Sequence, residues 1–383
     1  MQSTSVGTTP GTEDSTLKPS TAVEIDIRVG EATHRILFRC PTPVLARTPE
    51  SVLALSLIPC MSRGVPVVID EPVSARMLDS VPVIQQILAS WTRTLKVVDV
   101  IAERTTFTTA GERVGMFFSG GVDSWFTFLR HREEITDLVF IHGHDIELED
   151  GEARTRAAAA VREIAAETGR NLIEVESGIK KLPFRDVGWQ WTNGAALATI
   201  AHLLSSQFRR FYFPSSSYIG ALLPWGSHPH LDPRWSTEVY EFIHADADVS
   251  RVEKTRAIAE SPLALRTLRV CWERPDEYNC GRCEKCVRTM VALRAARALD
   301  RCKTFSTRLT PWRAFRGTTA NWATLPYIRS NLAALDPKQD RWLMLAVEAA
   351  TFLQPIKDLF SSMRRTLRLR SRFRRFLDLA GRP

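Results

Sequence analysis

The chain has 383 residues, of which 44% are hydrophobic and 25% charged, and its formal net charge at pH 7 is +8. These proportions are typical of a globular protein, and the length is enough for two or three structural units. No apolar run approaches the roughly 18 residues that a membrane-spanning helix needs. The polar N-terminus has neither a basic start nor an apolar core, so we expect no signal peptide.

The cysteine content favours a reducing compartment. Seven cysteines are an odd number, and four of them fall within one short segment. Clustered thiols of this kind are typical of metal binding in the cytosol rather than of a secreted disulfide framework. We therefore expect a cytoplasmic protein.

The first third of the chain is expected to form a leader and a small unit. Residues 1–22 are rich in Ser, Thr, Gly and Pro, which predicts a disordered leader. Residues 23–107 predict a small α/β unit, because VEIDIRV and HRILFRC alternate like half-buried strands. TPESVLALSLIPCM begins like a helix, and a helical stripe follows in SARMLDSVPVIQQILASWTRTL.

Strands and helices then alternate between residues 108 and 300. The expected strands are VGMFF, LVFIHG, NLIEVES and RRFYFPSS. The expected helices are DSWFTFLRHREEI, EARTRAAAAVREIAAETG, NGAALATIAHLLSS and VSRVEKTRAIAES. Such alternation predicts an α/β fold with a parallel sheet and helices on both faces. Residues 301–383 are expected to be helical and to end in a basic tail.

The segment SGGVDS interrupts two apolar stretches and predicts an anion-binding loop. Gly120 and Gly121 allow backbone angles that other residues avoid and leave room for phosphate oxygens. Ser119 and Ser124 add hydroxyl donors, and the following helix start adds a partial positive charge. Asp123 is expected to hold the loop or to place Mg²⁺. The alternative is a plain strand-to-helix turn with Ser or Asp as the N-cap.

This hexapeptide resembles the SGGxDS loop of the PP-loop ATP pyrophosphatases. The resemblance implies a Rossmann-like, HUP-type fold in which ATP is attacked at its α-phosphate and pyrophosphate leaves. It implies catalytic roles for Ser119, Asp123, Ser124 and Lys254, the last of which lies in VEKTRAIAE. It assigns nucleotide contacts to Ser119, Gly120, Gly121, Val122, Asp123, Ser124, His142 and Lys254. Without the loop, Lys254 would be interpreted as a solvated surface charge.

A Pro-rich, aromatic segment after the RRFYFPSS strand contains the candidate substrate residues. In an open α/β sheet the loops beyond the strand ends build the binding crevice. The candidates are Tyr218, Trp225, His228, His230, Asp232, Trp235 and Glu238, with Trp189 and Trp191 as further cleft residues. Any one of them can be a structural loop or packing residue, but the density of His, Trp and carboxylate in this one loop favours a substrate site. The spacing of the two histidines lacks a matching carboxylate, so we expect no metal there.

Four cysteines in CWERPDEYNCGRCEKCVR predict a metal site. Cys271, Cys280, Cys283 and Cys286 can close a tetrahedral site around structural Zn²⁺, and the same four sulfurs could hold a [4Fe–4S] cluster. The spacing, followed by VRTMVALRAA, closely resembles the zinc segment of the 7-cyano-7-deazaguanine synthases. The resemblance covers residues 112–300, about half of the chain.

Two motifs of that synthase family differ in this chain. HGHDIE stands where the family has a YGQRH-like motif, and WQWTNGAALA stands where it has a Pro-x-Arg-Asn motif. Both are tied to the substrate or catalytic pocket of the family. We therefore expect related chemistry on a different substrate.

The positive charge of the chain is concentrated at its C-terminal end. From residue 356 onward, nine lysines and arginines against two aspartates give a net charge of +7, which leaves about +1 for the rest. On a helical projection, most arginines lie opposite a broad apolar face that contains Met363, Leu367, Leu369, Phe373, Phe376 and Leu377. Such a helix can bind RNA, an anionic membrane or an acidic protein, or it can dock on the body with its arginines in water.

The sequence as a whole predicts an ATP-dependent ligase-like enzyme with ATP, Mg²⁺ and Zn²⁺ as its cofactors. It is expected to adenylate a carboxylate or amide-type carbonyl of a small or macromolecular substrate and to pass it to ammonia or an amine. Two alternatives remain open at this point. One is an RNA-modifying PP-loop enzyme that grips RNA through its tail, and the other is a non-catalytic nucleotide-binding regulator.

Overall fold

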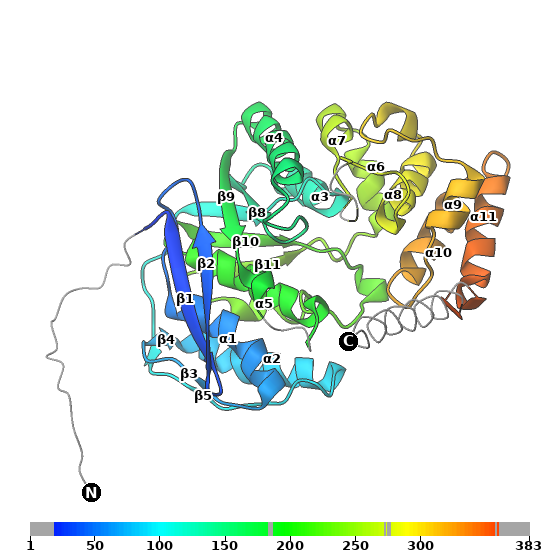
Figure 1. Cartoon of the computed structure of the whole chain (residues 1–383). Coiled ribbons are helices and arrows are strands. Elements are labelled where there is room, and N and C mark those ends of the chain that lie inside the picture. Colours follow the sequence, from blue (N-terminus) through cyan, green and yellow to red (C-terminus); the bar gives the residue numbers. More distant parts are fainter. Residues whose placement is uncertain (1–18, 183–186, 272, 274–276, 357, 360–383) are drawn as a thin grey trace, which may run out of the picture.

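A seven-stranded, mostly parallel sheet forms the centre of the molecule (Figure 1). This computed structural model describes residues 19–182, 187–271, 273, 277–356 and 358–359. The strand order is β1-β2-β9-β8-β7-β10-β11. The parallel strands are β7 (Arg113–Phe117), β8 (Asp137–His142), β9 (Asn171–Ser177), β10 (Phe208–Pro214) and β11 (Glu241–Ala245). The expected α/β fold with a largely parallel sheet is confirmed.

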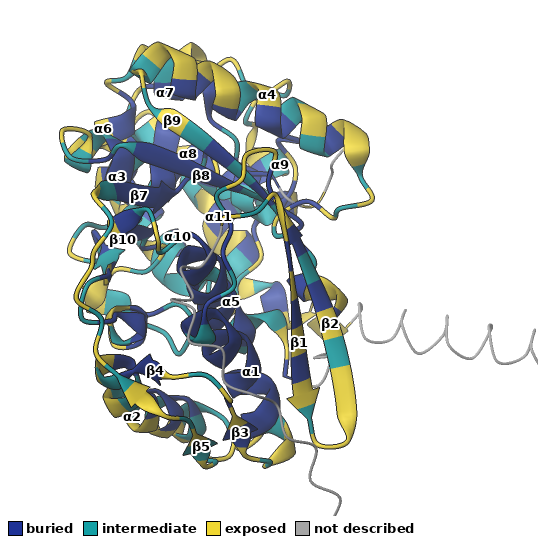
Figure 2. Cartoon of the chain, turned by 90° about the vertical axis from the view of Figure 1, so that its left-hand side faces the viewer, coloured by how far each residue is buried: buried dark blue, intermediate teal, exposed yellow. Residues whose placement is uncertain are grey.

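The N-terminal segment extends this same sheet. Strands β1 (Ala22–Val29) and β2 (Ala32–Arg39) form an antiparallel hairpin, and β2 pairs antiparallel with β9 through Phe38 opposite Ser177. The turn of the hairpin is exposed (Figure 2). Residues 23–107 were expected to form a separate small unit, but the two long strands of this segment lie at the edge of the central sheet. The same segment also contains short parallel pairs, β3 (Val67–Val68) with β5 (Val100–Ile101) and β4 (Val73–Ser74) with β6 (Arg104–Thr105).

Helices cover both faces of the sheet. One hydrophobic core joins the inward side chains of one sheet face to helices α1 (Pro49–Arg63), α2 (Ala75–Trp91) and α5 (Trp189–Leu203). A second core joins the other face to α3 (Val122–His131), α4 (Gly151–Thr168), α6 (Arg251–Ile258), α7 (Pro262–Thr267) and α8 (Glu284–Ala295). Adjacent residues of β7 point to opposite faces of the sheet, so Phe117 belongs to the first core and Met116 to the second.

Local signals in the sequence account for several helix ends. Thr48 forms a capping box with Ser51 at the start of α1, and Gly64 ends that helix with a left-handed φ of 68°. Gly169, the last residue of the segment EARTRAAAAVREIAAETG that was expected to be helical, ends α4 in the same way with a φ of 65°. Strand β11 was not predicted, because its five residues follow a long irregular segment.

Three further helices form a layer beside α8. They are α9 (Pro311–Gly317), α10 (Leu325–Ala334) and α11 (Arg341–Phe352), and they share a third, small core with Val287 and Val291 of α8. Figure 1 shows them at the end of the molecule away from the β1–β2 hairpin. The predicted leader up to residue 18 and the basic tail from residue 360 lie outside the described residues. Within the described part of the chain, no helix has the length and apolar content to cross a bilayer.

Candidate functional site

The SGGVDS loop lies where the order of the strands reverses. From β7 the chain passes to β8 and β9 on one side, and then to β10 and β11 on the other side. The carboxyl ends of β7 and β10 therefore diverge into separate loops at this point. In open α/β sheets, ligands bind in the crevice at such a switch point. The topology places residues 119–124 at that position.

The conformation of the loop depends on its glycines. Gly120 has a φ of 77°, which side chains other than glycine rarely tolerate, and its carbonyl accepts a hydrogen bond from Arg269 N at 2.9 Å. A Cβ atom at Gly121 would lie 3.3 Å from Ser119 Oγ and 3.6 Å from Arg269 O. Ser124 Oγ donates to Gly121 O at 3.0 Å. The loop is thus held by its own polar groups.

The start of α3 differs from the plain turn with a Ser or Asp N-cap that the sequence left open as an alternative. Gly121 is the N-cap residue, and among the described residues no side chain caps the first amides of this helix. Asp123 instead forms an ion pair with Arg251 of α6. The first amides of α3 therefore resemble an anion-binding helix start more than a side-chain-capped turn.

Lys254 is buried beside this loop. It is 1% exposed, and its Nζ donates to Ser215 O at 2.6 Å and lies 3.8 Å from Asp123 Oδ1. Burial lowers the pKa of Lys254, and the charge of Asp123 opposes that effect. The interpretation of this lysine as a solvated surface charge is wrong. Buried, incompletely neutralised charges in a crevice are candidates for functional groups.

A buried arginine adds to the positive charge near the loop. Arg288 of α8 lies over the ring of Tyr327, 4.2 Å from its centroid, and its Nε is 3.3 Å from Glu284 Oε1. Burial lowers the pKa of Arg288, and the charge of Glu284 opposes that effect. Tyr327 in turn donates to Ser216 O at 2.6 Å, which ties the C-terminal helices to the loop after β10. Near the switch point, the basic side chains Arg251, Lys254 and Arg288 therefore lie close to one another, together with the carboxylates of Asp123 and Glu284.

A chain of buried hydrogen bonds behind Lys254 was not predicted. The ring of His244 lies between Ser215 Oγ, 2.8 Å from its Nε2, and Asp232 Oδ2, 2.7 Å from its Nδ1. The Ser215 residue is 0% exposed and the His244 side chain 2%. This burial leaves the Ser215 hydroxyl no access to a substrate. The network instead holds Ser215 in place, and the carbonyl group of Ser215 accepts the hydrogen bond from Lys254 Nζ.

The predicted substrate residues do not gather into one cluster. Asp232 belongs to the buried network just described. The carboxylate of Glu238 accepts hydrogen bonds from Ser74 Oγ and Arg76 N at the start of α2, both at 2.9 Å, and so stabilises that helix end. Tyr218 is exposed and lies near the end of β11, because the next residue donates its amide to Ala247 O.

The two predicted histidines of this segment occupy a different environment. His228 is buried with its ring edge against Trp91 of α2, 4.9 Å between centroids, and its Nδ1 accepts the amide of His230 at 3.1 Å. Burial lowers the pKa of His228 to about 4, so its ring is neutral at pH 7. Trp235 is buried in the first core, and Trp191 packs against Trp91. Trp225 adjoins the start of α5, where its neighbour Gly226 donates to Gln190 O at 2.8 Å.

A polar group follows β8 at the carboxyl edge of the sheet. Trp189 packs edge-on against His144, 5.0 Å between centroids, and its ring lies 5.4 Å from Lys180 Nζ. Asp145 is an exposed residue; desolvation by its neighbours opposes ionisation of its carboxyl, but the charges of Lys285 and Arg269 outweigh this effect and lower its pKa. Arg269 also contacts the SGGVDS loop. These residues therefore link the loop after β8 to the loop after β7 and to the start of α8.

His142 lies in an ion-pair network between β8 and α4. Arg154 Nε donates to His142 Nδ1 at 3.3 Å, so His142 Nε2 carries the proton that is shared with Glu174 Oε2 at 3.0 Å. A cavity of about 620 Å³ adjoins this network, and it is lined by α4, β9 and the end of β2, including Arg39 and Glu176. The predicted contact between His142 and adenine stays a prediction.

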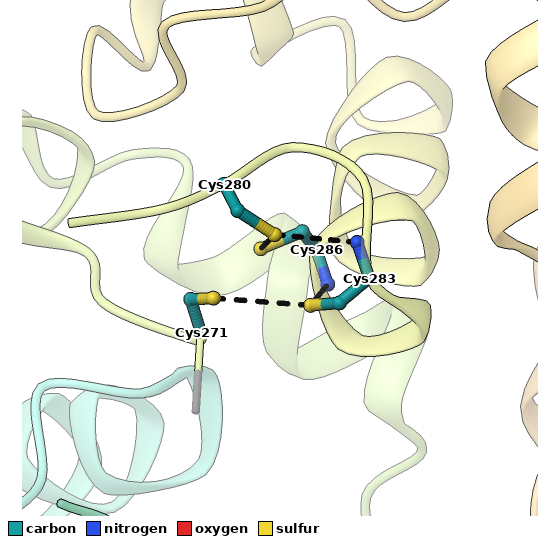
Figure 3. A group of neighbouring side chains, drawn as sticks. All are labelled: Cys271, Cys280, Cys283 and Cys286. Atoms are coloured by element: carbon teal, nitrogen blue, oxygen red, sulfur yellow. Dashed lines mark hydrogen bonds between the residues drawn. The ribbon is translucent and has the colours of Figure 1, made fainter. Parts of the chain in front are cut away.

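The four cysteines converge on one point (Figure 3). All four are buried, and their sulfur atoms lie within 4.8 Å of one another. Cys271 Sγ is 3.9 Å from Cys283 Sγ, and Cys280 Sγ is 3.8 Å from Cys286 Sγ. These separations are far too long for disulfides. Four thiolates arranged tetrahedrally around zinc at about 2.3 Å would be about 3.8 Å apart.

The backbone supports this arrangement of sulfurs. Gly281 takes a φ of 60° in the tight turn between Cys280 and Cys283. The amides of Arg282 and Cys283 point at Cys280 Sγ, at 3.4 and 3.3 Å. Amide donors of this kind stabilise thiolates, which are the metal-binding form of cysteine. The cluster could therefore hold a metal ion such as zinc, and it lies at the start of α8, the helix that also contains Arg288.

A scan against models of known protein families found no match for this chain. Searches of curated proteins and of solved structures found none either.

Proposed function

We propose that this chain is an ATP-dependent enzyme that adenylates a carboxylate or amide-type carbonyl, releases pyrophosphate and passes the activated carbon to ammonia or an amine. The observation that carries the proposal is the position of Lys254. It is buried at the switch point of the sheet, 3.8 Å from Asp123 of the SGGVDS loop. Keeping a lysine there costs desolvation energy, which a bound polyanion would offset.

In this proposal the loop holds the phosphates of ATP. The amides at the start of α3 and the hydroxyl of Ser119 donate hydrogen bonds to phosphate oxygens, and the hydroxyl of Ser124 does so by exchanging its hydrogen bond to Gly121 O for one to phosphate. Lys254 stabilises the negative charge that develops as pyrophosphate leaves. Its Nζ is oriented by Ser215 O, which the buried His244 network keeps in place.

Asp123 is the residue that would hold Mg²⁺. One carboxylate oxygen pairs with Arg251, whereas the other, Oδ1, is buried with no hydrogen-bond partner among the described residues. An oxygen ligand of this type suits Mg²⁺, which would neutralise phosphate charge when it is bound. The ammonium of Lys254 lies 3.8 Å from this oxygen but does not hydrogen-bond to it, and a metal or its bound water would supply the missing contact.

The cysteine cluster has a structural role in this proposal. A zinc ion bound by four thiolates has no open position for a substrate, which favours a structural site over a catalytic one. It would fix the start of α8 and with it Lys285 and Arg288, whose charges influence Asp145 and Asp123 respectively.

Binding of Mg-ATP tests the role of the loop. Full-length protein is expected to bind Mg-ATP in calorimetry, and Gly121→Val is expected to weaken binding by about tenfold or more, since its added methyl groups crowd the approach of phosphate. Gly121 has an extended backbone that valine can adopt, so the variant should fold. Gly151→Val is the matched control, because a Cβ at Gly151 meets nothing within 4 Å. Equal affinity of both variants for Mg-ATP, or no binding of Mg-ATP by the full chain, would show that the loop is a plain strand-to-helix turn.

A further inference from the structure

The guanidinium of Arg288 is buried without partners that satisfy it. Its side chain is only 11% exposed, and the nearest carboxylate oxygen, Glu284 Oε1, lies 3.3 Å from its Nε. Neither Nε nor the terminal nitrogens form a hydrogen bond with the described residues. A buried charge without hydrogen bonds costs free energy, and native proteins keep few such groups unless a ligand satisfies them. The burial of Arg288 therefore indicates a ligand that accepts hydrogen bonds.

Arg288 belongs to a cluster of charged side chains from three helices. Asp123 at the start of α3 pairs with Arg251 of α6, whose side chain is only 12% exposed. Lys254, about one turn further along α6, lies 3.8 Å from the other oxygen of Asp123. Arg288 of α8 lies close enough for the charges of Arg251 and Asp123 to act on it. Helices α6 and α8 therefore bring three cations close to the SGGVDS loop, where they repel one another.

Tyr327 of α10 holds Arg288 in this position. The guanidinium lies over the ring of Tyr327, 4.2 Å from its centroid. The phenol donates to Ser216 O at 2.6 Å, and Ser216 directly follows the residue whose carbonyl accepts the hydrogen bond of Lys254. Stacking on a ring fixes the plane of a guanidinium without using its N–H donors. The arginine is therefore oriented but not neutralised by this contact.

An anion with several phosphate groups suits this cluster. Arg251 is already paired with Asp123, and Lys254 donates to Ser215 O. Arg288 is thus the one cation of the three that has no hydrogen bond to the described residues. The planar guanidinium can donate to two phosphate oxygens at once, and neither a neutral nor a cationic ligand offers such a pair of charged acceptors. Phosphates held by the loop would lie next to Asp123 and so within the same cluster.

We infer that Arg288 binds the β- or γ-phosphate of ATP, and that α10 takes part in the nucleotide site by orienting this arginine through Tyr327. Lys254 is assigned to the pyrophosphate that leaves and belongs to the same cluster, so the phosphate bound by Arg288 is one of the two that leave. The inference rests on the proposed function. It gives the C-terminal helices, which the resemblance to the synthases does not cover, a place in the nucleotide site.

Calorimetric titrations with Mg-ATP and with AMP test the inference. In full-length protein, Arg288→Met is expected to weaken binding of Mg-ATP by about ten- to a hundredfold, because charge-assisted hydrogen bonds to a phosphate are lost. AMP lacks the β- and γ-phosphates, so its affinity should be unaltered. Arg294→Met is the matched control, because Arg294 lies near the other end of α8 and pairs with Asp340 at 2.9 Å. This control should leave both affinities unaltered.

The ratio of the two affinities separates a phosphate contact from a structural role. The inference is overturned if Arg288→Met lowers the affinities for Mg-ATP and AMP by the same factor. It is also overturned if Arg288→Met binds Mg-ATP like the unaltered protein while Gly121→Val binds it more weakly, and in that case the proposed function stands. A full chain that binds no Mg-ATP overturns both.

Arg288→Lys takes the place of Arg288→Met if the methionine variant does not fold. Lysine keeps the charge but lacks the planar fork that stacks on Tyr327 and binds two oxygens at once. We expect Arg288→Lys to weaken Mg-ATP binding by about three- to tenfold and to leave AMP binding unaltered. Unaltered binding of Mg-ATP by this variant would overturn the inference.

Discussion

Replacing Lys254 with methionine is expected to lower ATP-dependent turnover by roughly 10²–10³-fold while weakening Mg-ATP binding much less. The reason is that its charge is needed most when pyrophosphate departs, whereas the loop amides hold ATP in the ground state. Methionine has a similar length and tolerates the buried position of Lys254, which is 1% exposed. The readout is pyrophosphate release with a carboxylic acid that supports turnover, alongside calorimetric ATP binding.

Arg256→Met is the matched control, because Arg256 lies on the same helix but is exposed. A pH series adds an independent check. Burial lowers the pKa of Lys254 from its ordinary value of 10.5, so turnover should fall as the pH rises through that lowered pKa. Between the lowered pKa and 10.5 the unfolded chain binds more protons than the folded one, so this lysine makes the free energy of unfolding rise with pH. Lys254→Met should lose both effects, and a variant with unaltered turnover would remove Lys254 from the mechanism.

Removing the metal is expected to have the largest effect on stability. Purified protein should contain about one zinc per chain by elemental analysis, because four buried sulfurs lie within 4.8 Å of one another. Structural zinc sites typically have apparent binding free energies of about 10–16 kcal/mol, similar to or larger than the whole stability of a domain. Cys283→Ser should therefore yield unstable or insoluble protein, and strong chelators should lower the unfolding temperature.

Cys302→Ser separates loss of the metal from loss of any buried thiol. Cys302 is also buried, but its Sγ donates to Leu265 O at 3.2 Å, a contact that a serine hydroxyl can replace. This control should keep its zinc and most of its stability. Stoichiometric iron with a visible absorption band would instead identify an iron–sulfur cluster. Metal-free protein of normal stability would show that the four cysteines bind nothing.

The local parts of the fold could be predicted from the sequence, and the long-range pairings could not. Alternating apolar residues in the first two strands and short apolar runs in the others predicted the strands of the central sheet except β11, and Gly169 marked the end of α4. Nothing in the sequence indicates that Phe38 pairs with Ser177, 139 positions later, and so brings the β1–β2 hairpin onto the edge of the sheet. Register between distant strands depends on how complete faces pack, which local periodicity does not encode.

In the candidate site, too, the local motifs could be predicted from the sequence, whereas the long-range contacts could not. The loop glycines and the four cysteines are contiguous motifs whose spacing determines their geometry. The burial of Lys254 also had a signal, since Val252, Thr255 and Ile258 mark the inward face of α6 and Lys254 lies on it. The contact between Asp232 and His244 had none, because Asp232 was expected in an irregular substrate loop and the strand that contains His244 was not predicted. Only the return of the chain into β11 brings these side chains together with Ser215.

The products formed from ATP test the central claim most directly. Full-length protein with Mg-ATP and ammonia is incubated with a panel of carboxylic acids, including the deazaguanine acid, and the nucleotides are separated and quantified. The account predicts that a substrate yields AMP and pyrophosphate in equal amounts, because this loop would hold the β- and γ-phosphates as the leaving group. It also predicts that Lys254→Met abolishes most of this product. Formation of ADP and phosphate would contradict it, because attack would then have fallen on the γ-phosphorus.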